Sequence, residues 1–254
     1  MGLADIAARI EGRYQRFIGE HCARREVPMR NREPIVSFTF DDFPRSALFC
    51  AGEILHRHGL KGTYYSSLGL MGTTAPTGEI FVREDLETLF AQGHELGCHT
   101  FSHPNTWETE PAEFERTVIE NASALEQLQP SLRFKSFSYP ISGPRLRTKR
   151  NVGRMFESCR GGGQVINAGV ADLNLLRSFF LEKVRDDDAR IRAIVEENQR
   201  RGGWLIFSTH DVCPAPTPYG VTPELFESVV RWSLESGARV LTVEEATRTI
   251  AGQP

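Results

Sequence analysis

Short apolar runs alternate with longer amphipathic stretches from Pro34 to the end of the printed sequence. Runs of this length, bounded by polar or glycine-containing segments, predict β-strands. The strands predicted in this way are Ile35–Phe40, Gly62–Ser66, His94–Cys98, Phe134–Ser138, Leu175–Leu181, Trp204–Ser208 and Arg239–Leu241. We therefore expect a sheet whose strands are spread along the whole chain.

The stretches between these runs carry the apolar periodicity of helices. The predicted helices are Ser46–His58, Arg83–Gln92, Pro111–Leu128, Thr148–Phe156, Asp186–Arg201, Thr222–Glu235 and Val243–Ile250. Strands separated by helices of about ten or more residues form parallel βα units. Seven or so such units favour an α/β barrel over an open sheet, and they place the active site at the carboxyl ends of the strands.

The first 33 residues do not follow this alternation. Ile6–Cys22 has the pattern of an amphipathic helix, and Ala23–Glu33 is polar and basic, as in a loop. We interpret residues 1–33 as a helical appendage and residues 34–254 as one barrel domain, because no repeat or flexible linker divides the rest.

Composition narrows the possible partners. The formal net charge of the 254 residues is −3, which gives no electrostatic reason to expect nucleic acid or an anionic membrane. The five cysteines are scattered and form no C-x-x-C pair, so a disulfide framework or a structural zinc knot is not expected. We see no signal peptide and no apolar run near the about 18 residues of a membrane span, and we expect a cytoplasmic protein.

Two adjacent aspartates follow the first predicted strand, in the sequence Thr39-Phe40-Asp41-Asp42. Neighbouring side chains of an extended chain point in opposite directions, so one carboxylate can bind a metal ion while the other faces water or substrate. An Asp-Asp turn that caps the next helix is the simpler interpretation of the pair taken alone.

Two histidines follow the strand His94–Cys98, at positions 99 and 103. Histidines four positions apart can converge on one ion where the backbone makes a helical turn, although two unrelated surface histidines are an equal alternative. His94 and Glu95 do not complete the H-E-x-x-H motif of zinc proteases, because the next histidine comes one position too late. We expect this pair to support the loop.

A further histidine, His210, follows the apolar strand Trp204–Ser208. A histidine at the end of a barrel strand is a candidate acid or base, with an ordinary hydrogen-bonded histidine as the alternative. Asp211 is a candidate to orient it.

With these three clusters in this order, the chain resembles the polysaccharide deacetylases, the carbohydrate esterase family 4 or NodB-homology group. Members share a T-F-D-D motif, matched by Thr39–Asp42, an H-[ST]-x-x-H motif, matched by His99–His103, and a late histidine, matched by His210. The resemblance covers Pro34 to Val243. It implies a distorted (β/α)7, TIM-like barrel, in agreement with the strand and helix pattern.

The resemblance also implies roles for individual residues. A divalent metal ion would be bound by Asp42, His99 and His103; zinc is the expected ion, with cobalt or another divalent ion as alternatives. Asp41 would be the general base and His210 the general acid. Such a ligand set leaves open positions on the ion for water and the acyl oxygen.

The third motif of the family, R-x-P-Y, is altered here to Ser138-Tyr139-Pro140-Ile141. The arginine that would pair with the catalytic aspartate is therefore missing, as in a variant subgroup in which an arginine from a later strand fills the role. Arg177 is our candidate for it, and a structural salt bridge is an equal alternative. The resemblance also implies that Tyr139 and Ile141 belong to the substrate and oxyanion region. The family's tyrosine contributes its backbone N–H there, and Ile141 can do the same because no particular side chain is needed.

The fourth motif, an aspartate with a nearby tryptophan, has only a weak match in Asp172. The predicted function is metal-dependent hydrolysis of an N-acetyl or other acyl group on an amino sugar or oligosaccharide. An amidase for a small non-sugar C–N substrate and a non-catalytic glycan-binding barrel are the alternatives. The expected partner is a carbohydrate or small-molecule substrate, without nucleic acid or membrane, and a homo-oligomer is left open.

Overall fold

The computed structural model describes residues 12, 14, 16–141 and 143–252. Its main sheet has eight strands and only parallel pairings. The strands are β2 (Ile35–Phe40), β3 (Thr63–Ser66), β6 (Glu95–Cys98), β7 (Ser136–Ser138), β8 (Ser158–Arg160), β10 (Phe179–Phe180), β11 (Trp204–Thr209) and β12 (Arg239–Val240). Their order is β10-β11-β2-β3-β6-β7-β8, with β12 paired to β2.

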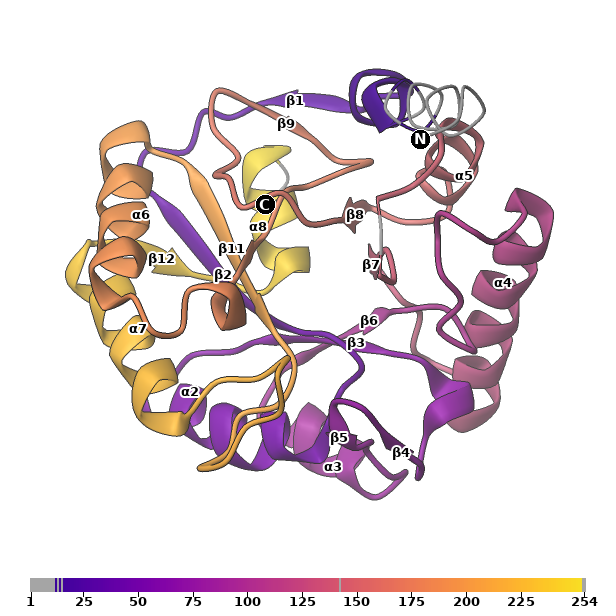
Figure 1. Cartoon of the computed structure of the whole chain (residues 1–254), viewed down its shortest axis with the longest axis horizontal. Helices are drawn as coiled ribbons and strands as arrows, with labels where there is room; N and C mark the ends of the chain where they lie inside the picture. Colours follow the sequence, from indigo (N-terminus) through magenta and orange to yellow (C-terminus); the bar gives the residue numbers. More distant parts are fainter. Residues whose placement is uncertain (1–11, 13, 15, 142, 253–254) are drawn as a thin grey trace, which may run out of the picture.

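The two ends of this seven-strand path meet through the chain that leads into β10. Arg160, the last residue of β8, forms an isolated parallel bridge with Leu176. The Leu176 N–H donates to the carbonyl of Cys159 at 2.7 Å, and the Gly161 N–H donates to the carbonyl of Leu176 at 2.8 Å. The sheet therefore curls into the distorted (β/α)7 barrel that the sequence predicted (Figure 1).

Helices surround the sheet (Figure 1). They are a π-helix (Ala47–Gly52) that continues into α2 (Glu53–Arg57), α3 (Asp85–Ala91), α4 (Pro111–Leu128), α5 (Leu146–Val152), α6 (Asp188–Arg201), α7 (Pro223–Glu235), α8 (Val243–Ile250) and the 3₁₀ turns Leu68–Leu70 and Leu181–Lys183. Two small antiparallel sheets pair β1 (Glu26–Pro28) with β9 (Val170–Asp172) and β4 (Thr74–Ala75) with β5 (Gly78–Glu79). Among the described helices, none is long and apolar enough to cross a membrane.

Strand β2 shows how the sheet divides the molecule into two compartments. Every residue of β2 is buried, as expected for a strand covered on both faces. Val36, Phe38 and Phe40 belong to the larger hydrophobic cluster, which also contains residues of the surrounding helices. Ser37 and Thr39 alternate with these residues and form hydrogen bonds to β11. The Ser37 hydroxyl accepts from Trp204 Nε1, and the Thr39 hydroxyl donates to the carbonyl of Phe207. The side chains of Ser37 and Thr39 therefore face the barrel interior, and Asp41 follows in the same alternation.

Helix α8 closes the amino-terminal side of the barrel interior. Val243, Ala246 and Ile250 of this helix form a second, smaller hydrophobic cluster with Ile35 and Trp204, the first residues of β2 and β11. A capping box begins the helix at Thr242. The apolar plug lies at one end of the barrel, so the polar motif residues gather at the other, carboxyl end.

Most predicted elements are present, and the differences lie where pairing rather than periodicity decides. The predicted helix Ser46–His58 begins as a π-helix. Only Phe179–Phe180 of the predicted strand Leu175–Leu181 is a strand, and β8 was not predicted at all. The predicted loop Ala23–Glu33 contains strand β1, because β9 supplies a partner for it. Of the predicted helix Ile6–Cys22, residues 6–11, 13 and 15 lie outside the described residues, and residues 16–21 are helical.

The segment before the barrel is fastened to it by buried polar contacts. The Arg25 guanidinium donates to the carbonyls of Phe156 and Glu157 at 2.9 and 2.6 Å. The Lys149 ammonium lies fully buried, 2.8 Å from a carboxylate oxygen of Asp172. These contacts, together with the β1–β9 pairing, place the N-terminal segment against the part of the barrel that β8 and β9 form.

Candidate metal centre and active-site pocket

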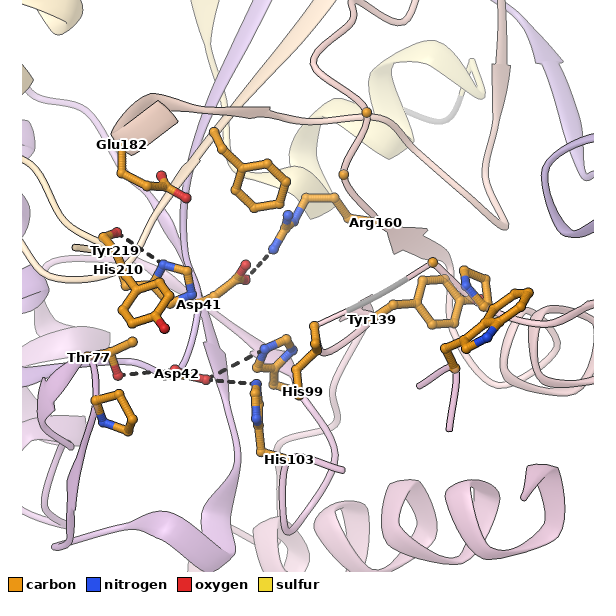
Figure 2. Close-up of a pocket in the computed structure, with 18 of the residues that line it drawn as sticks. Asp41, Asp42, Thr77, His99, His103, Tyr139, Arg160, Glu182, His210 and Tyr219 are labelled. Atoms are coloured by element: carbon orange, nitrogen blue, oxygen red, sulfur yellow. Dashed lines mark hydrogen bonds and ion pairs between the residues drawn. The ribbon is translucent and has the colours of Figure 1, made fainter. Parts of the chain in front are cut away.

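A cavity of about 1040 Å³ opens at the carboxyl ends of the strands. The residues to which the resemblance assigned metal-binding or acid–base roles all line it: Asp41, Asp42, His99, His103 and His210. The parallel register brings these residues together, because β2, β6 and β11 end at the same edge of the sheet. Figure 2 shows their side chains converging from different strands.

Asp42, His99 and His103 form one cluster at the wall of this cavity. An Asp42 oxygen, Oδ1, lies 3.2 Å from His103 Nε2 and 3.7 Å from His99 Nε2. One ligand atom from each of the three residues lies within 4.8 Å of the others. The pair of histidines is therefore convergent, and the alternative of two unrelated surface histidines is excluded.

The surroundings of the cluster leave its ligand atoms free for an ion. The His99 Nδ1–H donates to the carbonyl of Ser138 at 2.8 Å, which turns the lone pair of Nε2 toward the cluster. Burial lowers the pKa of His99 to about 4, so the ring is neutral near pH 7, as a metal ligand must be. Thr77 donates to Asp42 Oδ2 at 3.1 Å, whereas the buried Oδ1 accepts no hydrogen bond within the described part of the chain. These features fit a divalent cation.

The backbone at the cluster is held in an unusual conformation. Asp42 and His103 both have positive φ angles, 63° and 54°, as do Phe43 and Thr100 beside them. Non-glycine residues rarely adopt this region, which costs about 1–3 kcal/mol each, and such residues cluster at active sites and ligand-binding turns. The turn at Asp42 directs its carboxylate to the histidines, while Asp41 points to the opposite wall (Figure 2).

The Asp41 carboxylate is the centre of a second, buried network. Oδ1 contacts the Arg160 guanidinium and accepts from Ser138 Oγ at 3.2 Å, and Oδ2 accepts from Ser208 Oγ at 3.3 Å. Burial by itself raises the pKa of Asp41, but the charge of Arg160, with smaller contributions from His99 and His210, outweighs it. The pKa of Asp41 is therefore held below its ordinary range, and the carboxylate is ionised at neutral pH.

The arginine that pairs with Asp41 is Arg160, and the prediction of Arg177 for this contact is wrong. Ser138 and Arg160 face each other in the register of β7 and β8, so the guanidinium enters from the strand next to the altered motif. Arg160 Nη2 also donates to Ser138 Oγ at 2.6 Å. Arg177 lines a more distant part of the cavity, where its Nη1 lies 3.5 Å from Glu20 Oε1.

His210 faces the cavity from the end of β11. Its Nδ1 and its backbone N–H both lie 3.2 Å from the carbonyl of Tyr219. Since a carbonyl only accepts, Nδ1 carries the proton and Nε2 is the ring atom left for other partners. Glu182 lines the same cavity, and burial raises the pKa of its carboxyl to about 7.

The two residues expected near an oxyanion differ in what they can offer. The Tyr139 ring lines the cavity, but its N–H donates to the carbonyl of Arg160 at 2.9 Å and its hydroxyl to that of Asn174 at 3.2 Å. The polar groups of Tyr139 are therefore used within the fold, and its predicted oxyanion role is not supported. Ile141 lies at the cavity wall, has a φ of 62° and is 67% exposed.

Two further residues singled out in the sequence have partners away from the cluster, and the expectation that Glu95 supports the histidine loop is wrong. Asp172 accepts from the backbone N–H groups of Arg25 and Asn174 and pairs with Lys149, so it is a structural carboxylate of β9. Glu95 accepts from Thr63 Oγ1 and from the Glu244 N–H, which holds the start of α8 rather than the histidine loop.

Sequence reasoning missed Arg160, Glu182, Tyr219 and the aspartate-binding serine Ser208. The signal for Arg160 was weak, because β8 is a strand of only three residues followed by three glycines. Glu182 and Tyr219 lie in a 3₁₀ turn and a loop, where no periodicity marks them.

Comparison with known proteins agrees with this geometry. Residues 29–155, half of the chain, match the polysaccharide deacetylase family. A peptidoglycan-N-acetylglucosamine deacetylase of Listeria monocytogenes is 27% identical over 124 residues, 48% of this chain and 24% of the relative. A chitooligosaccharide deacetylase of Bradyrhizobium is 30% identical over 117 residues, 45% of this chain and 49% of the relative. The matched region thus spans half or less of these curated relatives.

The fold has relatives among solved structures as well. A family 4 acetyl xylan esterase from Clostridium thermocellum, in complex with a cobalt ion, is 18% identical and superimposes with a TM-score of 0.56. The alignment covers 87% of this chain and 93% of the esterase. From the matched motifs, the barrel and the clustered site residues, we conclude that this chain belongs to the polysaccharide deacetylase family.

Proposed function

We propose that the protein is a metal-dependent hydrolase that removes an N-acetyl group from an amino sugar within an oligosaccharide. The observation that carries this proposal is the single cavity shared by the Asp42–His99–His103 cluster, the Asp41–Arg160 pair and His210. Deacetylation needs an electrophile for the carbonyl, a base for water and an acid for the leaving nitrogen. The chain offers a group for each task.

Asp42, His99 and His103 are the residues that would hold the metal ion, and zinc is the ion we expect. When bound, a divalent ion supplies Lewis acidity to the acyl oxygen and lowers the pKa of water. The cobalt ion of the related xylan esterase supports a divalent ion in this family fold without deciding its identity here.

Asp41 would take the proton from the attacking water. Arg160 and Ser138 occupy Oδ1, so Oδ2, which accepts only the longer bond from Ser208, is the oxygen that can receive the proton. Arg160 keeps the carboxylate ionised before the reaction and fixes its direction. We propose that this arginine, rather than Arg177, defines the variant form of the third motif.

His210 would protonate the departing nitrogen from Nε2, since Nδ1 is held by the carbonyl of Tyr219. Water adds to the carbonyl carbon, the C–N bond breaks, and the amine leaves with the proton from His210, while acetate is the other product. We propose the Ile141 N–H as a donor to the oxyanion, because this residue lies at the cavity wall.

The size of the cavity supports an oligosaccharide over a small C–N compound. Its volume of about 1040 Å³ stands at the upper end of the range for sites that enclose drug-sized ligands, which is about 300–1,000 Å³. The activities named for the Listeria and Bradyrhizobium relatives, on peptidoglycan N-acetylglucosamine and chitooligosaccharide, support the same substrate class.

The test combines metal analysis with acetate release from N-acetylated chitooligosaccharides. We expect about one zinc ion per wild-type chain and its loss in His103→Ala. We expect Asp41→Asn to keep the ion but to release acetate about 10²–10⁴ times more slowly. His56→Ala removes an exposed histidine of α2 that does not line the cavity, and it serves as the matched control.

The proposal fails if the fully metallated wild type releases no acetate from any acetylated amino sugar. Release of ammonia or an amine from small amides instead would favour an amidase. Binding of the oligosaccharide without turnover would favour a non-catalytic barrel.

A further inference from the structure

The carboxylate of Asp211 points into the loop that follows His210. Asp211 is 2% exposed and accepts from the Thr217 N–H at 2.8 Å and from the Thr217 hydroxyl. Its own carbonyl accepts from the Val221 N–H at 3.1 Å, and Val212 forms a bridge with Val221. Asp211, the first residue of the loop 211–221, is therefore bonded both to Thr217 within the loop and to Val221 at its end.

Other features make this loop a stiff unit. Gly220 packs directly on Asp211, and a Cβ atom at this glycine would collide with the Asp211 carboxylate and carbonyl. Pro214, Pro216 and Pro218 lie within the loop and restrict its backbone further. A loop with these constraints holds its carbonyl groups in fixed directions.

One of those carbonyl groups belongs to Tyr219, and it is directed at His210. It accepts from the His210 N–H and from ring atom Nδ1, both at 3.2 Å (Figure 2). The carbonyl therefore selects the form of the neutral ring that carries its proton on Nδ1. It also orients the ring, and it stabilises the charge on Nδ1–H when the ring is protonated.

We infer that Asp211 is a positioning residue for His210, acting through the Thr217 contacts and the Tyr219 carbonyl rather than by direct contact with the ring. Asp211 builds the loop, the loop places the carbonyl, and the carbonyl keeps Nε2 toward the leaving nitrogen. This inference rests on the proposed function, because only a reaction with a poor leaving group needs a proton from Nε2.

Two substrates with different leaving groups test the inference. An N-acetylated chitooligosaccharide must have its amine protonated as it departs, whereas 4-nitrophenyl acetate releases a phenolate that needs no acid. We expect Thr217→Val to slow the amide reaction at least about tenfold and to leave the ester reaction within about twofold. His210→Ala should show the same imbalance to a larger degree.

Further variants separate positioning from loss of stability. Asp211→Ala should act more strongly than Thr217→Val, and Asp211→Asn, which keeps an acceptor oxygen, should lie between wild type and Asp211→Ala. Thr242→Ala removes a buried threonine hydroxyl from the cap of α8, at the opposite end of the barrel, and should leave the ratio of the two rates unchanged.

A spectroscopic measurement tests the same idea without turnover. In protein labelled with ¹⁵N-histidine, the His210 signals are assigned by their absence in His210→Ala. The wild-type neutral ring should show the proton on Nδ1, and Thr217→Val and Asp211→Ala should shift the population toward Nε2–H.

Equal slowing of both substrates in Thr217→Val, or an unchanged His210 tautomer in Asp211→Ala, would overturn the inference. If the wild type releases no acetate at all, the proposed function fails while the tautomer measurement still decides whether Asp211 positions His210.

Discussion

At the scale of single residues, the site depends on two neighbouring aspartates that face different partners. The positive φ of Asp42 turns its carboxylate toward His99 and His103, whereas Asp41 continues the inward series of β2 and meets Arg160. The sequence indicated that the two side chains diverge. It did not indicate which arginine would neutralise Asp41.

The two candidate arginines should differ sharply when each is replaced by alanine. Arg160 is 1% exposed, and its removal leaves the buried Asp41 carboxylate without a cation. Such a loss typically costs about 3–5 kcal/mol of the free energy of unfolding. The Arg177 side chain is 29% exposed and pairs with a half-exposed Glu20, so Arg177→Ala should cost less than about 1 kcal/mol. Urea denaturation of both variants measures the difference, and equal destabilisation would contradict this account.

Glu182 should give the stability of the protein a measurable pH dependence. Burial raises the pKa of its carboxyl to about 7, against about 4.3 in the unfolded chain. Between these two pH values the folded protein keeps a proton that the unfolded chain has released. The contribution of the protonated Glu182 carboxyl to stability is therefore complete below about pH 4.3 and is lost as the pH rises through about 7.

The free energy of unfolding of Glu182→Gln should therefore rise relative to that of wild type as the pH increases from 5 to 8. The gain should be at most about 1.4 kcal/mol for each pH unit between the unfolded and folded pKa values. Urea midpoints at pH 5, 6, 7 and 8 measure the gain. Glu235→Gln removes an exposed carboxylate on α7 and should show no such trend; a flat difference for Glu182→Gln would argue against its burial.

At the scale of elements, long helices support the short strand ends from outside. Asn121 of α4 accepts from the Leu68 N–H and donates to the carbonyl of Ser66, both at 2.9 Å, and also contacts Cys98 Sγ. A single side chain thus satisfies the backbone just beyond β3 and touches the end of β6, directly before His99.

Asn121→Ala should be strongly destabilising, because each buried backbone group left unpaired costs about 1–3 kcal/mol. Glu120→Ala changes the neighbouring, exposed residue of the same helix and should cost less than about 1 kcal/mol. Thermal or urea unfolding compares the two variants. A small effect of Asn121→Ala would mean that water replaces the amide at these backbone groups.

At the scale of the whole molecule, the site is assembled from distant parts of the chain. The family match ends at residue 155, yet Arg160, Glu182 and His210 reach the same cavity. The N-terminal segment contributes as well, since Glu20 lines the cavity and Arg25 is anchored to the barrel. An ion at the centre of such an assembly should stabilise all of it.

Metal binding should therefore raise the free energy of unfolding by mass action. Zinc at about 100 times its dissociation constant should add about 2.7 kcal/mol to wild type, and a chelator should remove this gain. His103→Ala should show neither effect, while His56→Ala should behave like wild type. A gain of the same size in His103→Ala would place the binding site elsewhere.

The sequence by itself determined the barrel, most of its helices and strands, and the convergence of Asp41, Asp42, His99, His103 and His210. Hydrophobic periodicity is a local property, so the sequence shows where the strands and helices lie. Parallel strands bring their carboxyl ends to one edge of the sheet, so motifs that directly follow strands come close together. The metal identity and the cellular location stay predictions.

Only the tertiary structure decided which side chains complete the site. Arg160 faces Ser138 because two strands pair in a particular register, and a strand of three residues leaves no periodic trace in the sequence. Glu182 takes its perturbed pKa from burial, and Tyr219 reaches His210 because Asp211 closes a loop. The Arg160–Ser138 contact joins two separate strands, and the Tyr219–His210 contact is made across a folded loop, so both depend on packing that local patterns do not encode.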